Sequence, residues 1–130
     1  MTTLSPLVQG DTWEIQVAKY NPLPNGKPDV NSPVDFTGYE AKLQLKTAAY
    51  ATVLTLTSNP AAGLVVNDNT SGSDGPLGTI DVHATPAQTE LFEPGSLLWE
   101  IEVTKTVSSV IVDRRTLAGG ILPVVKQITS

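Results

Sequence analysis

Few residues of this 130-residue chain carry side chains suited to catalysis, and His83 is its only histidine. His83 alternates with Asp81 in a strand-type segment, so both side chains are expected on one face, and hydroxyl groups are near in sequence at Ser73 and Thr85. A histidine, a carboxylate and a hydroxyl are the members of a hydrolase triad. Because neither hydroxyl lies in a nucleophile-elbow motif, we interpret His83 as a surface histidine at the end of a strand.

Two pairs of carboxylates have a spacing that glycoside hydrolysis could use, Glu90 with Glu93 and Glu100 with Glu102. Glu100 and Glu102 alternate along one strand and share its wet face, so solvation explains them without catalysis. Only 5% of the residues are aromatic, which gives little support to stacking platforms for sugars. We therefore expect no enzymatic activity and no catalytic residues.

The segment from Asp68 to Asp74 is rich in the oxygen ligands that calcium prefers. It lacks the EF-hand frame, which ends in a bidentate glutamate, and it is interpreted as a polar loop whose calcium binding stays open. The sequon Asn69-Thr70-Ser71 is interpreted as chance, because the first residues show no export signal. The chain has no cysteine, which excludes disulfides, zinc fingers and thiol catalysis, and we expect no cofactor and no metal.

Charge and hydropathy exclude two further classes of partner. The formal net charge is −5 and the sequence pI is about 4.6, whereas binding to nucleic acid or anionic membranes needs clustered cations. Arg114 and Arg115 are the only adjacent basic residues, and in a strand they would point to opposite faces. Apolar runs are only a few residues long, far short of a membrane span. We expect neither nucleic acid, membrane nor small-molecule substrate as a partner.

The elements that position these residues are short strands. Alternating polar and apolar residues predict strands of this kind. The strand-type segments are Leu4–Val8, Thr12–Ala18, Tyr39–Lys46, Thr52–Thr57, Gly63–Val66, Leu77–Val82, Leu97–Thr104, Ser108–Leu117 and Gly119–Thr129. The proline-rich stretch Asn21–Phe36 is predicted to be a long loop without regular structure, and Asn67–Pro76 a polar loop. One helical turn is predicted near 85–91, where Thr85 is the N-cap and Pro86 the first helical residue.

These elements indicate an all-β fold in one domain spanning residues 1–130. Eight or nine short strands without long crossover helices favour antiparallel pairing in a two-sheet sandwich of Ig-like type, with a closed barrel as the alternative. Trp13 and Trp99 are expected to lie on opposing inner faces, because large aromatics in amphipathic strands are usually core residues.

The order of several short motifs resembles the small β-sandwich virion proteins of tailed phages and prophages, in particular the N-terminal domain of upper baseplate proteins. The motifs are Gly10-Asp11-Thr12, Thr37-Gly38, Ala87-Gln88-Thr89, Pro94-Gly95 and the closing Gly119-Gly120-Ile121-Leu122-Pro123-Val124. The resemblance covers nearly the whole chain. It implies a structural building block present in many copies in a virion.

The sequence thus predicts a non-enzymatic component of a phage tail, baseplate or neck (collar), made in the host cytoplasm and located in the virion. Its expected partners are other virion proteins and copies of itself, as a homo-oligomer. The expected contact elements are Asn21–Pro33, Asn67–Pro76 and the two ends of the chain. The polar faces that carry Glu40, Lys42, Lys46, Glu100 and Glu102 are expected to face solvent or form polar interfaces. The alternatives are an Ig-like adhesion or carbohydrate-binding module, for which Tyr20 and Tyr50 are the aromatic candidates, and a capsid decoration protein.

Overall fold

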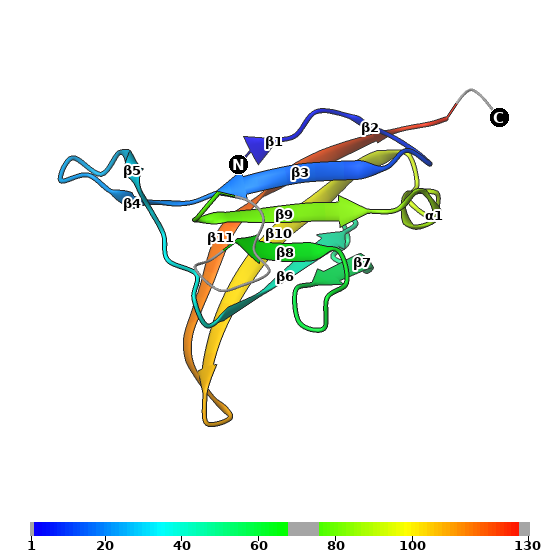
Figure 1. Ribbon diagram of the computed structural model, residues 1–130. Coiled ribbons are helices and arrows are strands. Elements are labelled where there is room, and N and C mark those ends of the chain that lie inside the picture. The colour runs from blue at the N-terminus through cyan, green and yellow to red at the C-terminus, as the bar shows by residue number, and fades with distance from the viewer. Residues whose placement is uncertain (1, 68–75, 128–130) are drawn as a thin grey trace.

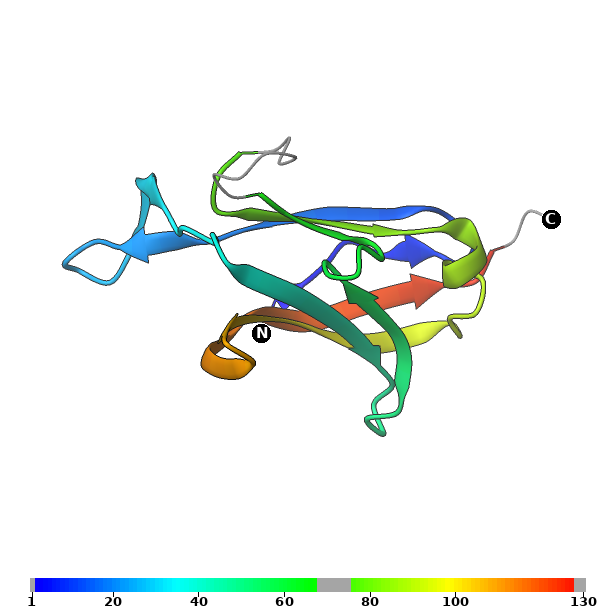
Figure 2. The same cartoon turned by 60° about the horizontal axis from the view of Figure 1, so that its bottom comes forward.

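Two β-sheets lie face to face in the computed structural model, which describes residues 2–67 and 76–127 (Figure 1). The larger sheet has six strands in the order β1-β11-β10-β6-β7, with β2 also paired to β11. Its strands are β1 (Thr2–Thr3), β2 (Leu7–Val8), β6 (Tyr39–Lys46), β7 (Thr52–Thr57), β10 (Gly95–Val107) and β11 (Val110–Val125). The smaller sheet has the order β3-β9-β8, and Figure 2 shows it as a second layer over the larger one. Its strands are β3 (Trp13–Ala18), β8 (Leu64–Asn67) and β9 (Thr79–Ala84).

This architecture confirms the prediction of an all-β sandwich with mainly antiparallel pairing. The pairs β10–β11, β6–β10, β6–β7, β3–β9 and β8–β9 are all antiparallel. Only the short strands β1 and β2 pair with β11 in parallel, which lays the start of the chain beside its end. No helix among the described residues is long and apolar enough to cross a membrane.

The core lies between the two sheets and follows the period of two in the sequence. On β10 the residues Leu97, Trp99, Ile101 and Val103 are all buried, while their neighbours along the strand are more exposed. Trp13 on β3 and Trp99 on β10 are each 5% exposed and belong to opposite sheets, as predicted. Side chains of both sheets form one continuous apolar cluster, which is consistent with a single folding unit.

The proline-rich stretch Asn21–Phe36 was predicted to lack regular structure, and this prediction is wrong. The stretch contributes most residues of an antiparallel hairpin, whose strands are β4 (Tyr20–Pro22) and β5 (Pro28–Pro33). This hairpin is the third sheet of the molecule and has only these two strands. Prolines are tolerated because the sheet has only two strands, so each strand keeps one side free of ladder hydrogen bonds. Gly26 adopts a φ of 84° in the connecting turn, a conformation that glycine reaches without steric cost.

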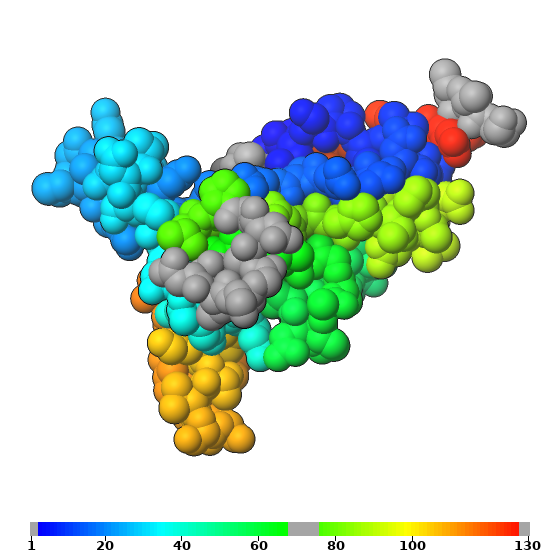
Figure 3. All heavy atoms as spheres, in the orientation of Figure 1, coloured from blue at the N-terminus to red at the C-terminus, as the bar shows by residue number. Residues whose placement is uncertain are grey.

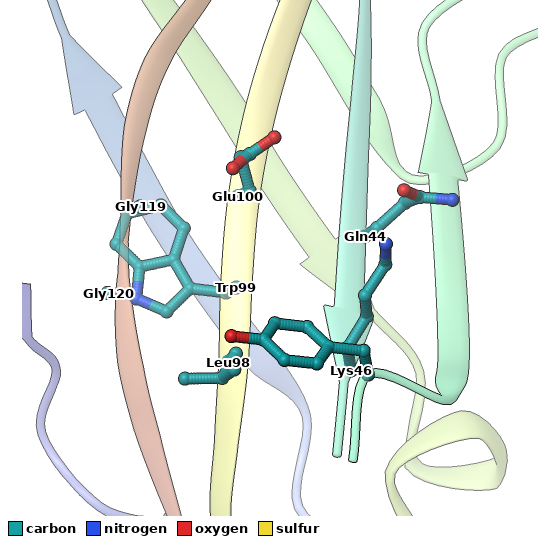
Figure 4. Close-up of a pocket in the computed structure, with 8 residues that line it drawn as sticks. Gln44, Lys46, Leu98, Trp99, Glu100, Gly119 and Gly120 are labelled. Carbon is teal, nitrogen blue, oxygen red and sulfur yellow. The ribbon is translucent and has the colours of Figure 1, made fainter. Parts of the chain in front are cut away.

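The end of the chain also differs from the prediction of two separate segments. Residues Val110–Val125 form one continuous strand of 16 residues, and the strand runs through Gly119 and Gly120 without a break. Their backbone stays paired with Glu100 and Trp99, respectively, on β10. The indole of Trp99, which lies on the core side of the sheet, extends toward β11 (Figure 4) and packs where Gly120, the residue opposite it, has no side chain.

The predicted helical turn is confirmed as α1 (Pro86–Thr89). The hydroxyl of Thr85 accepts a hydrogen bond from the Gln88 backbone amide at 3.3 Å, and the Gln88 side chain accepts one from the Thr85 amide at 2.9 Å. This reciprocal capping box satisfies two amide groups that otherwise lack partners at a helix start.

Candidate functional site

The residues of the hypothetical triad do not form one. Nδ1 of His83 lies 3.0 Å from Oε1 of Glu14 on β3, whereas Oδ1 of Asp81 accepts a hydrogen bond from Gln16 at 2.8 Å. The Thr85 hydroxyl is engaged in the helix cap, and Ser73 lies outside the described residues. His83 and its neighbours therefore form polar cross-strand pairs on the outer face of the smaller sheet.

The two carboxylates of the pair Glu100 and Glu102 have different surroundings. Oε1 of Glu102 lies 3.5 Å from Nε of Arg114 on the neighbouring strand, while Glu100 faces a hollow described below. Glu90 and Glu93 are exposed beside α1. The proposed calcium loop from Asp68 to Asp74 lies outside the described residues. In residues 2–67 and 76–127, no three histidine or carboxylate groups are close enough to hold a metal ion.

The most prominent surface feature is the outer end of the β10–β11 hairpin. Residues 104–113, here called the arm, form the end of this hairpin, which projects from the body of the molecule (Figure 1 and Figure 3). Four β-branched apolar residues near its tip are half or more exposed: Val107 (52%), Val110 (62%), Ile111 (50%) and Val112 (56%). An exposed group of apolar side chains on one protrusion is typical of an interaction surface.

The turn at the tip of the arm connects the two strands through only two residues. Ser108 and Ser109 have φ values of 51° and 67°, the left-handed region expected for both central residues of a type I′ turn. Such a turn matches the twist of the two strands, which pair up to Val107 and Val110 beside it. Serine is a poor residue for this conformation, which glycine and asparagine adopt more easily.

A cluster of polar and aromatic residues fixes the base of the arm. The hydroxyl of Tyr39 on β6 donates a hydrogen bond to Oδ2 of Asp113 on β11, and Nε of Arg115 donates to the same oxygen at 2.9 Å. Nζ of Lys105 lies 5.8 Å from the centroid of the Tyr39 ring, close enough for a cation–π interaction. Phe36 packs edge-on against this ring, with the centroids 6.3 Å apart.

These contacts displace the pKa values of two groups in opposite directions. The hydrogen bond to Asp113 raises the pKa of Tyr39 above its usual value, and burial adds to this effect. The same hydrogen bond lowers the pKa of Asp113, assisted by the positive charge of Arg115. The pair is therefore held as neutral tyrosine and ionised aspartate over a wide pH range.

The arm also presents a free backbone edge. Strand β11 pairs with β10 on one side, whereas its pairing with β1 begins only at Gly120. Residues 110–119 therefore have no strand on the second side within the part of the chain that the structure describes. Unpaired edge amides and carbonyls are a template for strand addition from another chain.

The β4–β5 hairpin is a second projection, at another corner of the molecule (Figure 1). Its exposed apolar residues are Val30, which is 71% exposed, and Leu23 in the connecting turn. Asn21–Pro33 was expected to be a contact element, and this expectation stays a prediction. The sequence analysis did not select the arm tip, although the run Val110-Ile111-Val112 breaks the alternation and was a possible signal of apolar residues on both faces.

A hollow of about 250 Å³ lies on the outer face of the larger sheet, away from the core. It is called the outer hollow and is lined by Gln44, Lys46, Tyr50, Leu98, Trp99, Glu100, Gly119 and Gly120. Figure 4 shows side chains from β6 and β10 around it, with the bare backbone of the two glycines on β11.

The two tyrosines considered for sugar stacking do not share a surface. Tyr50 lines the outer hollow, whereas Tyr20 lines a different hollow of about 150 Å³ between β4 and the base of the arm. The exposed aromatic cluster expected of a carbohydrate-binding module with several stacking platforms is thus not formed by these residues.

Comparison with protein-family models and with curated proteins finds no match for this chain. Its class is therefore defined by the fold and by its surfaces. It is an all-β sandwich of two sheets that carries a rigidly based arm with an apolar tip.

Proposed function

We propose that this chain is a structural protein of a phage virion, a component of the tail, baseplate or neck that acts by multimeric assembly. The exposed apolar tip of the arm is the observation that carries the proposal. The resemblance of its motifs to small β-sandwich virion proteins supports the same conclusion from the sequence. Its partners are copies of itself and other virion proteins.

Burial of the arm tip supplies a driving force for assembly. Val107, Val110, Ile111 and Val112 lie on a projection that the sandwich does not cover. Moving such half-exposed side chains into an interface contributes on the order of 1 kcal/mol each. The free edge of residues 110–119 adds backbone hydrogen bonds to this surface, because a neighbouring strand can align with it.

The base of the arm reduces the entropic cost of this binding. Tyr39, Lys105 and Arg115 surround Asp113 and hold the two strands of the arm against β6. An interaction element that is ordered before binding loses less conformational freedom when it binds. A rigid arm is therefore suited to a contact of defined geometry, as a symmetric ring or other closed multimer requires.

The alternatives differ in what they require of the surface. A carbohydrate-binding or adhesion module that uses several aromatic residues on one surface is less well supported, because Tyr20 and Tyr50 line separate hollows. A capsid decoration protein also assembles with virion proteins, and it would use the same arm. The Ig-like arrangement of the strands likewise stays a prediction.

Light scattering of the purified chain during size-exclusion chromatography tests the proposal. We expect a multimer of defined copy number whose population rises with protein concentration. A monodisperse monomer at every concentration, combined with absence of the chain from labelled phage particles in electron micrographs, would contradict it. Labelling of such particles also distinguishes the tail, baseplate and neck from the capsid surface.

A further inference from the structure

We propose that the outer hollow is a binding site for a neutral saccharide, recognised as a single sugar ring. This inference does not depend on the proposed assembly function, because the hollow lies on the outer sheet face and includes no residue of the arm. It rests on the polar groups, the aromatic side chain and the bare backbone that meet there.

Four polar side chains around the hollow are not engaged within the protein. Gln44, Lys46, Tyr50 and Glu100 form no side-chain hydrogen bond or ion pair with any residue in the described ranges. Glu102, two residues further along β10, is in contrast paired with Arg114, and Glu40 on β6 accepts a hydrogen bond from Asn59. Converging polar groups with free hydrogen-bonding capacity are typical of a ligand site.

The pairing register explains why these groups lie together. Glu100 on β10 is directly opposite Gln44 on β6, and Leu98 is opposite Lys46. On the other side of β10, Glu100 is opposite Gly119, which has no side chain. The resulting row has polar side chains on β6 and β10 and, at Gly119, no side chain on β11.

Gly119 keeps this space open. A Cβ atom at this position would lie 3.1 Å from the Trp99 carbonyl oxygen and 3.9 Å from Cβ of Glu100, on the side of the sheet that carries Glu100. Any larger residue would therefore project into the hollow. The φ of Gly119 is outside the left-handed region, so the backbone conformation does not require glycine. The nearby Trp99 carbonyl oxygen disfavours a side chain, and the absence of one leaves the hollow open over β11.

Tyr50 supplies the aromatic surface and is held in a strained conformation. It is 74% exposed, and its φ of 63° is unfavourable for a residue with a large side chain. Its amide donates a hydrogen bond to the Thr47 carbonyl at 2.8 Å, which closes the turn between β6 and β7. Strain of this kind at an exposed aromatic residue indicates a role in contacting a ligand rather than in stability.

The chemistry of the lining favours a neutral polyhydroxylated ligand. Lys46 and Glu100 carry opposite charges, so a singly charged ligand would be repelled by one of them. Hydroxyl groups both donate and accept hydrogen bonds, and can therefore serve the amide, ammonium and carboxylate groups together. The C–H face of a sugar ring provides the apolar surface that stacks on tyrosine. An apolar arm tip is a poorer occupant, because it would bury these polar groups without partners.

Titration in two-dimensional ¹H–¹⁵N NMR spectra, with glucose, galactose, N-acetylglucosamine and rhamnose as probes, tests this inference. We expect at least one sugar to shift the amide signals of Gly119, Gly120 and Glu100 in a saturable way. Tyr50→Asn, which suits the left-handed turn but lacks the ring, and Gly119→Ala, which narrows the hollow, should each weaken binding by about tenfold or more, equivalent to 1.4 kcal/mol. Leu91→Ser, at an exposed residue beside α1, is the matched control and should bind like the wild type.

Two results would overturn the inference. One is that none of the four sugars shifts the Gly119 and Gly120 signals of the folded wild-type protein. The other is that binding is unchanged in both Tyr50→Asn and Gly119→Ala, with thermal melting used to confirm that the variants are folded. The assembly proposal is tested by particle size, so either proposal can fail without the other.

Discussion

The two halves of the β10–β11 hairpin differ in the burial of their apolar side chains, although they belong to the same pair of strands. In the inner half, apolar residues such as Ile101 alternate with polar ones and are buried against the smaller sheet. In the outer half, apolar residues such as Ile111 are exposed, and no sheet covers them within the described part of the chain. The folding of this chain explains why the residues of the inner half are apolar, but it does not explain the apolar residues at the arm tip. The difference supports the proposal that the arm contacts another molecule.

The sharpest test of this difference compares the same substitution in the two halves. Ile101→Ala should destabilise the protein by about 2–5 kcal/mol, because Ile101 is 0% exposed and its truncation leaves a cavity. Ile111→Ala should change the unfolding free energy of the monomer by less than about 0.5 kcal/mol, since the side chain is half exposed. Urea unfolding at low protein concentration measures both. Equal losses of stability would show that the arm is part of the folding core.

A smaller effect is expected where the arm joins the body. Tyr39→Phe removes the hydrogen bond to Asp113 and should cost about 1 kcal/mol. Hydrogen exchange should accelerate at arm amides such as that of Ile111, with little change at Ile101 in the core. Tyr20→Phe is the matched control, because its hydroxyl makes no hydrogen bond with the described residues. Uniform acceleration in both regions would contradict a local role for Tyr39.

The same hydrogen bond predicts a pH dependence. The raised pKa of Tyr39 gives a contribution to stability that is complete below the usual tyrosine pKa and is lost as pH rises through its folded value. The lowered pKa of Asp113 gives a contribution present above the usual aspartate pKa and lost as pH falls through its folded value. Asp113→Asn should lower the pKa of Tyr39, measured by ultraviolet titration. An unchanged Tyr39 titration would show that another group causes the shift.

The smallest expected effect concerns the turn at the arm tip. Ser109→Gly should stabilise the folded state by about 0.5 kcal/mol, because glycine adopts a φ near 67° without strain. Leu91→Gly, at an exposed residue without a left-handed φ, is the control and should not stabilise the protein. Thermal unfolding shows whether each variant is more or less stable than the wild type. A destabilised Ser109→Gly variant would contradict the assigned turn.

The sequence predicted those elements whose signal is local. The alternation predicted strands over Thr12–Ala18 and Tyr39–Lys46; β3 begins one residue later, at Trp13, and β6 has the predicted bounds. Thr85 and Gln88 predicted the helix cap. The hairpin within Asn21–Phe36 was missed because proline cannot donate a backbone hydrogen bond and is therefore usually excluded from strands. It is tolerated here because β4 and β5 pair only with each other, so one edge of each strand needs no hydrogen bonds, and the sequence does not show this. The continuity of β11 was missed because it depends on cross-strand pairing of Gly120 with Trp99.

The candidate surfaces depend even more on information that the sequence lacks. The alternation placed Glu100 on a polar face, but only the register of β6 and β10 places it opposite Gln44. The apolar character of Val110, Ile111 and Val112 was visible in the sequence. Their exposure was not, because it follows from the length of the arm beyond the smaller sheet.

The role of the arm in assembly is tested most directly by the particle size of an arm-tip variant. Val110→Ser, Ile111→Ser and Val112→Ser are combined, and sedimentation of this variant is compared with that of the wild type. We predict a defined multimer for the wild type and a folded monomer with an unchanged core for the variant. A variant that assembles like the wild type would contradict the account.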